Sequence, residues 1–349
     1  MKKILVILTG GTIGSRIEEH IINVSDKSPY QLLAMYEEEY GVENFDVIQP
    51  INVLSENMTP DLWLQLFRAI KKIDVNNYDG IIVTHGSDTL SYTAAFMGML
   101  FHDMPVPVVL VASNYPLGQK GSNGLSNFAN AVCLIREHIV RGVFVVYQDN
   151  AGINQVYLAT RITEADPLCD QFGDFAKIPF GRMENGHLKI NESEFLPTLS
   201  QVNERCGKEF EIPCELSGNV LAIRPYPGLD YSMFDLSKKP AAVLHYLYHS
   251  ATACANSENK GYEMLSFAEK CKESGIDFYT ASHKSPEGNR YVTGDALLKA
   301  GVTPLYNISF EAAYAKIVLG YHQKNKVIGG KLQKDIYFET VGAKNMLNL

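Results

Sequence analysis

Apolar runs recur along the first half of the chain, and polar or helical stretches separate them. Each run is apolar at successive positions, which is typical of strands that are buried on both faces of a parallel sheet. Helical patterns follow several of the runs, for example over residues 29–40 and 90–100. The pattern predicts a mainly parallel sheet flanked by helices, with strands over residues 4–8, 45–50, 78–83, 107–112 and 142–147.

A polar, irregular stretch follows this region and leads to further strand patterns, over residues 220–223, 241–246 and 278–282. Glycine, proline and polar residues concentrate in interdomain linkers. We therefore predict an α/β protein with a larger N-terminal domain over residues 1–185, a linker over residues 186–216 and a smaller C-terminal α/β domain over residues 217–349.

The first strand runs directly into the loop Thr9-Gly10-Gly11-Thr12-Ile13-Gly14. Adjacent glycines allow unusual backbone dihedrals and close approach of a ligand, and the carboxyl ends of strands are where open α/β sheets bind ligands. A dinucleotide or phosphate loop is disfavoured, because the order is G-G-T-I-G and no lysine follows. A hydroxyl group delivered by a glycine turn is a better fit to a nucleophile.

The third predicted strand ends in a second loop of the same kind, Thr84-His85-Gly86-Ser87-Asp88-Thr89. Taken alone, Ser87 and Asp88 are as well explained as residues that cap the following helix. Two loops that each deliver a hydroxyl group after a glycine are much rarer by chance than one, which favours a shared site.

Together the two loops resemble the T-G-G-T-I and H-G-T-D-T signatures of the L-asparaginase/glutaminase family, most closely the cytoplasmic, type I bacterial enzymes. The resemblance implies an asparaginase-like fold whose catalytic domain is the N-terminal one. It implies that Thr12 is the nucleophile and Ser87 its partner. Asp88 would bind the substrate α-ammonium, and N–H groups at Gly11 and Gly86 would stabilise the oxyanion.

Three further positions match the family's substrate-binding pattern. Ser55 and Glu56 precede Met58-Thr59-Pro60, where the resemblance implies contacts to the substrate α-carboxylate and α-ammonium. Ser113 ends the fourth predicted strand, where the family contributes a backbone carbonyl to the substrate amide.

The chain departs from the family pattern at three places. Ile21 stands at the position of the tyrosine in the segment after the first loop. The catalytic lysine position falls on Thr163 or Glu164, depending on a gap of one residue. Residues 251–254 replace a G-x-G-N motif in the C-terminal domain.

Composition adds mainly exclusions. The 349 residues carry a net charge of −8, which disfavours nucleic-acid binding, and no apolar stretch is long enough for a membrane span. The apolar run after Lys2 and Lys3 is too short for a signal peptide, which favours the cytoplasm. Neither the six cysteines nor the nine histidines show metal-ligand spacing, so we expect no metal and no cofactor. The resemblance implies a homodimer or homotetramer.

Two hypotheses for function follow. The first is an amidohydrolase that converts L-asparagine to L-aspartate and ammonia. The second is a catalytically altered relative that binds a small amino acid or hydrolyses a different small amide, because it lacks the lysine and the tyrosine. The retained hydroxyl groups favour the first.

Overall fold

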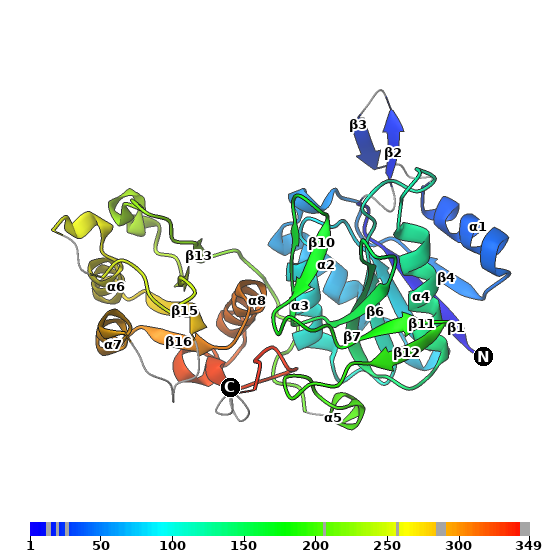
Figure 1. The fold of residues 1–349 in the computed structure, drawn as a ribbon. Helices are drawn as coiled ribbons and strands as arrows, with labels where there is room; N and C mark the ends of the chain where they lie inside the picture. Colours follow the sequence, from blue (N-terminus) through cyan, green and yellow to red (C-terminus); the bar gives the residue numbers. More distant parts are fainter. Residues whose placement is uncertain are drawn as a thin grey trace. The chain divides into compact units, whose positions relative to one another are not determined.

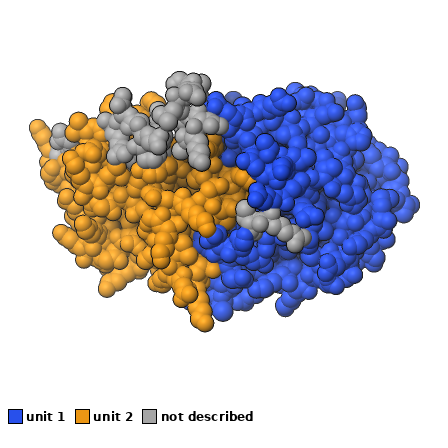
Figure 2. Space-filling model, turned by 90° about the horizontal axis from the view of Figure 1, so that it is seen from below, with its two compact units in different colours: residues 1–215 blue, residues 216–349 orange. Residues whose placement is uncertain are grey.

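The computed structural model describes residues 1–11, 15–18, 21–24, 28–204, 207–255, 258–283 and 291–342. The chain forms two compact units, unit 1 over residues 1–215 and unit 2 over residues 216–349 (Figures 1 and 2). In the described part of the chain, none of the helices has both the length and the apolar character needed to cross a lipid bilayer.

Unit 1 is built on one eight-stranded sheet. The strands β4, β1, β5, β6 and β7 pair in parallel, and β8, β11 and β12 continue the sheet with antiparallel pairing. The strands, from one edge to the other, are β12 (His187–Ile190), β11 (Gly181–Glu184), β8 (Asn154–Leu158), β7 (Gly142–Gln148), β6 (Pro107–Val111), β5 (Tyr78–Thr84), β1 (Lys3–Leu8) and β4 (Phe45–Ile48).

The predicted strands of the first half are confirmed, and the apolar pattern has the expected cause. Residues 4–8 of β1 and residues 80–84 of β5 are buried. Helices cover the sheet on its two faces: α1 and α4 pack together on one, and α2 and α3 lie on the other (Figure 1). The helices of unit 1 are α1 (Ser28–Tyr40), α2 (Pro60–Lys71), α3 (Leu90–Phe101), α4 (Gly124–Arg136) and α5 (Leu199–Asn203).

Helix α2 begins where the sequence predicts. Thr59 is its N-cap, and the side-chain oxygen of Thr59 accepts a hydrogen bond from the backbone N–H of Leu62. Pro60 occupies the first helical position, where its missing N–H costs nothing. The cap fixes the direction of the chain as it leaves the loop that contains Ser55.

Residues 186–216, predicted as a linker, hold both regular and irregular structure. Strand β12 pairs with β11 in the large sheet, and α5 is a short helix with a capping box formed by Thr198 and Gln201. The domain boundaries at residues 185 and 217 stay a prediction.

Two small hairpins extend unit 1. Strands β2 (Ser15–Glu18) and β3 (Ile21–Val24) form one of them, in the segment after the first loop. Strands β9 (Ile162–Asp166) and β10 (Gln171–Asp174) form the other, which contacts α3. This second hairpin carries Thr163 and Glu164.

Unit 2 has a four-stranded parallel sheet, which confirms a second, smaller α/β unit. Its strands are β13 (Val220–Ile223), β14 (Ala242–Tyr246), β15 (Asp277–His283) and β16 (Thr303–Tyr306), and its helices are α6 (Met264–Glu273), α7 (Val292–Lys299) and α8 (Phe310–Tyr321). A buried ion pair ties α8 to the chain after it, because Lys316 Nζ lies 2.5 Å from Glu339 Oε1. Glu339 also accepts the backbone N–H groups of Ile336 and Tyr337, so its buried carboxylate has hydrogen-bond donors besides the Lys316 ammonium.

A carboxyl group is buried in the β9–β10 hairpin with only part of its hydrogen-bonding capacity used. Asp174 is 4% exposed; its Oδ1 accepts the N–H of Ala176 at 2.7 Å, whereas its Oδ2 has no hydrogen-bond partner among the described residues. Burial raises the pKa of Asp174 to about 7, against a smaller opposing effect of the Ala176 N–H and of Arg161. The unfolded chain ionises such a carboxyl near pH 4.

We therefore expect Asp174→Asn to stabilise the protein in a pH-dependent way. The native state holds the carboxyl protonated, so it loses stability relative to the unfolded chain as the pH rises from about 4 to about 7. The substitution removes this loss, so the stability gain grows over that interval to at most about 4 kcal/mol. Denaturant unfolding between pH 4 and pH 8 measures it.

Asp166→Asn in the same hairpin is the matched control, and its expected effect on stability has the opposite sign. The backbone N–H of Leu168 and hydrogen bonds from Cys169 lower the pKa of Asp166. The ionised carboxylate of Asp166 stabilises the folded protein above the pKa of the unfolded chain, and this stabilisation is lost as the pH falls. Asp166→Asn should therefore destabilise the protein increasingly as the pH rises through about 4. A stability change in Asp174→Asn that is the same at every pH would contradict the burial argument.

Candidate active site

Two glycine loops meet at the carboxyl ends of neighbouring strands. Leu8 pairs with Thr84 at the last position of β1 and β5, and the hydroxyl of Thr9 donates a hydrogen bond to the carbonyl of Thr84 at 2.7 Å. Gly11 then turns with φ +79°, so that a Cβ atom there would lie 2.4 Å from the backbone nitrogen of Gly86. The two backbones are in contact, and only glycine fits at residue 11.

A third loop joins them and supplies a hydroxyl group. Ser55 begins the 3-10 helix η2 (Ser55–Asn57) and is buried. Its Oγ lies 3.1 Å from the Asp88 carboxylate and accepts the backbone N–H of Asp88 at 3.2 Å. A Cβ atom at Gly86 would be 2.5 Å from this Oγ, so glycine is required here too. The hydroxyl of Thr89 donates to the Ser55 carbonyl at 2.8 Å and closes the contact.

The structure thus brings Gly11, Ser55, Gly86 and Asp88 together, from three loops far apart in the sequence. Ser87 lies between the last two and is half-buried, whereas Asp88 is exposed. Glu56 follows Ser55 and is exposed. Thr12, the expected nucleophile, lies outside the described residues, although its neighbour Gly11 forms the closest contact with the second loop.

Ser113 lies at the same edge of the sheet, after β6. The backbone N–H of His85 donates to the carbonyl of Val111 at 2.8 Å, which holds the β6 end beside the second loop. The hydroxyl of Ser113 donates to the carbonyl of Tyr115 at 2.5 Å and lies 3.0 Å from the hydroxyl of Ser122. This side chain is therefore engaged within its own loop.

Of the two positions aligned with the family's lysine, Glu164 is the one that contacts the helix of the second loop. The hydroxyl of Tyr92, in the first turn of α3, donates to Glu164 Oε1 at 2.6 Å. Successive side chains of a strand point to opposite faces, so Thr163 faces the other way. There it lies against Gly173, where an added Cβ would be 2.7 Å from Thr163 Oγ1. A carboxylate thus stands beside the first turn of α3.

A buried hydrogen-bond chain, which the sequence alone did not reveal, supports the second loop. Trp63 Nε1 donates to Thr93 Oγ1 at 2.8 Å, and Thr93 Oγ1 lies 2.9 Å from His85 Nε2. His85 Nδ1 lies 2.8 Å from the carbonyl of Gly86, which can only accept, so Nδ1 carries the proton. Nε2 then accepts from the Thr93 hydroxyl.

Burial lowers the pKa of His85 to about 4, so the ring is neutral near pH 7 and its tautomer is set by these partners. His85 is completely buried and holds the carbonyl of Gly86, directly before Ser87. The signal in the sequence was a histidine between a buried strand and a glycine, and only the fold shows which groups it joins.

The arrangement offers hydroxyl groups, carboxylates and backbone N–H groups at one sheet edge. These are the groups that nucleophilic hydrolysis of an amide requires. Within the described residues, no group of three or more histidine, cysteine, aspartate or glutamate side chains is placed to hold a metal ion.

Comparison with known proteins agrees with this geometry. Residues 3–195 match the family model described as asparaginase, N-terminal. An L-asparaginase from Thermococcus kodakarensis is 27% identical, over 98% of this chain and 100% of that protein. A subunit of the glutamyl-tRNA(Gln) amidotransferase from Pyrococcus abyssi is 26% identical, over 93% of this chain and 73% of that protein.

Solved structures confirm the fold. The thermostable L-asparaginase from T. kodakarensis superposes with a TM-score of 0.77 at 22% identity, covering 98% of this chain and 100% of that one. L-asparaginase I from Vibrio cholerae gives a TM-score of 0.75 at 23% identity, covering 97% and 99%. Since the family model spans more than half of the sequence, the chain belongs to the asparaginase family and is an amidohydrolase.

Proposed function

We propose that this protein hydrolyses the side-chain amide of L-asparagine to L-aspartate and ammonia. The observation that carries the proposal is the backbone contact between Gly11 and Gly86. The residue after each glycine bears a hydroxyl group, Thr12 in one loop and Ser87 in the other. The match to the T. kodakarensis L-asparaginase over its full length supports this substrate.

In the proposed reaction, the hydroxyl oxygen of Thr12 attacks the side-chain amide carbon. The C–N bond breaks, the nitrogen takes a proton and leaves as ammonia, and a β-aspartyl ester with Thr12 remains. A water molecule then attacks the ester, releases L-aspartate and restores the Thr12 hydroxyl. The N–H group of Gly86 stabilises the oxyanion, because the N–H group of Gly11, which was also expected to do so, donates to the carbonyl of Val53 at 3.0 Å. Ser87 activates the water or takes over the nucleophilic role.

The amino-acid part of the substrate is held by the third loop and its partner. The carboxylate of Asp88 is exposed and fixed by Ser55, so it can receive the α-ammonium. Glu56 adds a second carboxylate beside it, Ser55 contacts the α-carboxylate, and Ser113 lines the amide end.

Proton transfer requires a group other than lysine, because the family's lysine position falls on Thr163 or Glu164. We propose that Glu164 is the base that accepts a proton during hydrolysis of the ester, and that Tyr92 orients it. A carboxylate accepts protons without needing the depressed pKa that a lysine base requires. Thr163, on the opposite face of the strand, has no part in this step.

A second candidate is hydrolysis of another small amide. The change from lysine to Glu164 favours it, because a carboxylate near the reacting group alters the charge that a substrate meets. We further propose a cytoplasmic homodimer or homotetramer, as the resemblance implies; one structural neighbour is a probable cytoplasmic L-asparaginase from Campylobacter jejuni.

Ammonia release from L-asparagine tests the proposed reaction, with L-glutamine as the competing substrate. Thr12→Ala removes the nucleophile and is expected to lower kcat by roughly 10³-fold or more. Ser87→Ala is expected to lower it by roughly 10²-fold or more. A coupled assay for ammonia, with mass spectrometry of the aspartate formed, measures both.

Ser91→Ala is the matched control, because the Ser91 hydroxyl is buried in the first turn of α3 and has no hydrogen-bond partner in the described part of the chain. Its loss should leave turnover unchanged. Undiminished hydrolysis by Thr12→Ala would refute the assigned nucleophile, and faster hydrolysis of glutamine than asparagine would replace the proposed substrate by the second candidate.

The role of Glu164 gives a separate expectation. Glu164→Gln keeps the size of the side chain and its hydrogen-bond acceptor but removes the base, so kcat should fall about 10²-fold with little change in KM. Tyr92→Phe should lower kcat less, since the carboxylate itself remains. Steady-state kinetics across pH 5 to 9 measure this, and Asp166→Asn on the same strand serves as the control. An unaltered kcat in Glu164→Gln would show that another group moves the proton.

A further inference from the structure

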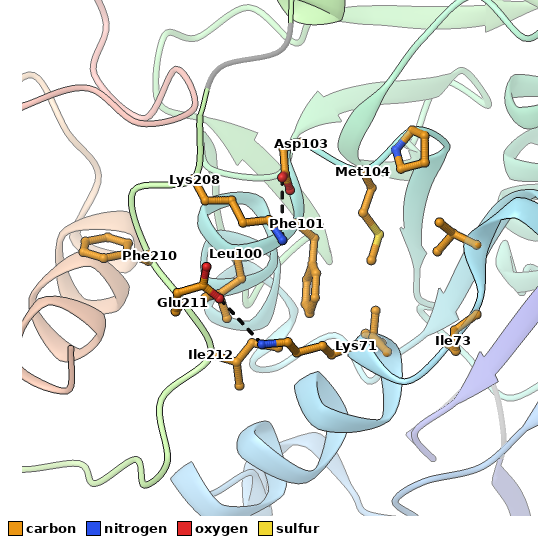
Figure 3. A pocket seen from close by; sticks show the side chains of 13 residues that line it. Lys71, Ile73, Leu100, Phe101, Asp103, Met104, Lys208, Phe210, Glu211 and Ile212 are labelled. Atoms are coloured by element: carbon orange, nitrogen blue, oxygen red, sulfur yellow. Dashed lines mark ion pairs between the residues drawn. The ribbon is translucent and has the colours of Figure 1, made fainter. Parts of the chain in front are cut away.

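A cavity of about 220 Å³ lies in unit 1 at the far ends of α2 and α3 (Figure 3). Both helices begin beside the loops of the candidate active site, and each is 12 residues long, which corresponds to about 18 Å. Their last turns line the cavity, together with the loop after α3 and with Lys208, Phe210, Glu211 and Ile212. The cavity is therefore separate from the site proposed for amide hydrolysis.

The inner wall of the cavity is apolar. Ile70, Leu100 and Phe101 are buried, and Met104 and Ile212 are half-buried around them. Figure 3 shows the ring of Phe101 and the side chain of Met104 facing this space. An apolar cavity of about 150 Å³ is enough for benzene. The present one can hold an aliphatic or aromatic side chain of ordinary size.

The rim carries two ion pairs of mixed sign. Lys71 Nζ lies 3.6 Å from Glu211 Oε2, and Lys208 Nζ lies 3.6 Å from Asp103 Oδ2. These distances exceed the roughly 2.8 Å of a charge-assisted hydrogen bond. Exposed ion pairs contribute little to stability. The side chains of Lys71 and Lys208 are 58% and 47% exposed, so their ammonium groups can turn to a ligand at small cost.

The C-terminal ends of α2 and α3 also affect which ligand charge the cavity favours. The last turns of α2 and α3 line the cavity, and the C-terminal end of a helix favours a positive charge. Together with Asp103 and Glu211 they favour an ammonium group. Lys71 and Lys208, at the same rim, favour a carboxylate. A ligand with both charges satisfies all four side chains, whereas an amine or an acid alone satisfies only two.

We propose that this cavity is a binding site for a small zwitterion with an apolar side chain, namely an aliphatic or aromatic α-amino acid. The ammonium group lies between Asp103 and Glu211, the carboxylate is bound by Lys71 and Lys208, and the side chain fills the space along Phe101 and Met104. The inference is independent of the reaction proposed above, because it uses neither Thr12 nor the loops around Gly86.

Isothermal titration calorimetry on the full chain tests the proposal with L-leucine, L-methionine and L-phenylalanine as probes. At least one of them should bind saturably at millimolar concentration or below. Isoamylamine and 4-methylpentanoate each keep the side chain and one charge of leucine, and should bind at least about tenfold more weakly. No saturable binding of any amino acid, or equal binding of the single-charge analogues, would overturn the proposal.

Substitutions then locate the bound amino acid. Ile212→Trp fills the cavity and should abolish binding, and Asp103→Asn should weaken it by about tenfold or more if the ammonium lies there. Lys72→Met changes an exposed lysine that does not line the cavity and should leave the affinity unchanged. Thermal melting of each variant shows that it is folded.

Asp88→Asn separates this site from the candidate active site. Binding of the apolar amino acid should persist in this variant, even if amide hydrolysis is lost. Loss of binding in Asp88→Asn, or its persistence in folded Ile212→Trp, would show that the amino acid binds elsewhere. If Ile212→Trp fails to fold, Asp103→Asn becomes the deciding variant. An unchanged affinity of Asp103→Asn for the amino acid would then refute the site.

Discussion

The candidate active site depends on the close approach of two backbones at the ends of β1 and β5. Gly11 and Gly86 touch with no space for a Cβ atom between them, and Gly86 also packs against the hydroxyl of Ser55. A side chain at either position would separate the loops. Because Ser87 follows Gly86 directly, the same contact limits where this hydroxyl-bearing residue can lie. The parallel pairing of the strands makes it possible, since it brings both loops to one edge of the sheet.

Neutral hydrogen bonding within the core supports this contact. The hydrogen bonds from Trp63 through Thr93 to His85 end at the carbonyl of Gly86. Residues of α2 and α3 therefore hold the second loop in place. A charged His85 in this position would lack solvation, and its lowered pKa is the consequence of complete burial. The loop is thus fixed by a network that carries no net charge near pH 7, while Asp88 at the end of the loop is exposed.

The pattern of apolar runs was enough to predict the parallel strands of the large sheet and the second α/β unit, because buried parallel strands leave a strong local signal. It did not predict the antiparallel strands β8, β11 and β12 that extend the sheet. Features of the candidate site could be predicted only where a residue type at a given place in a strand or helix is a signal by itself. The glycines after a buried strand and the helix cap at Thr59 are such signals. What could not be predicted depends on contacts between distant segments. The hydrogen bond from Tyr92 to Glu164 joins α3 to β9, which no local pattern in the sequence shows. The role of His85 needed Thr93 and Trp63, and residues 187–190 looked polar although they pair at a sheet edge.

The central claim is that the two glycine loops and Ser55 form one pocket for an amino-acid amide. A crystal structure of the protein with L-aspartate, the proposed product, tests it most directly. The account predicts the α-ammonium of aspartate at the Asp88 carboxylate, its α-carboxylate at Ser55, and its side-chain carboxylate between the hydroxyl groups of Thr12 and Ser87. Aspartate bound away from these loops, or with its side chain pointing away from both hydroxyl groups, would contradict the account.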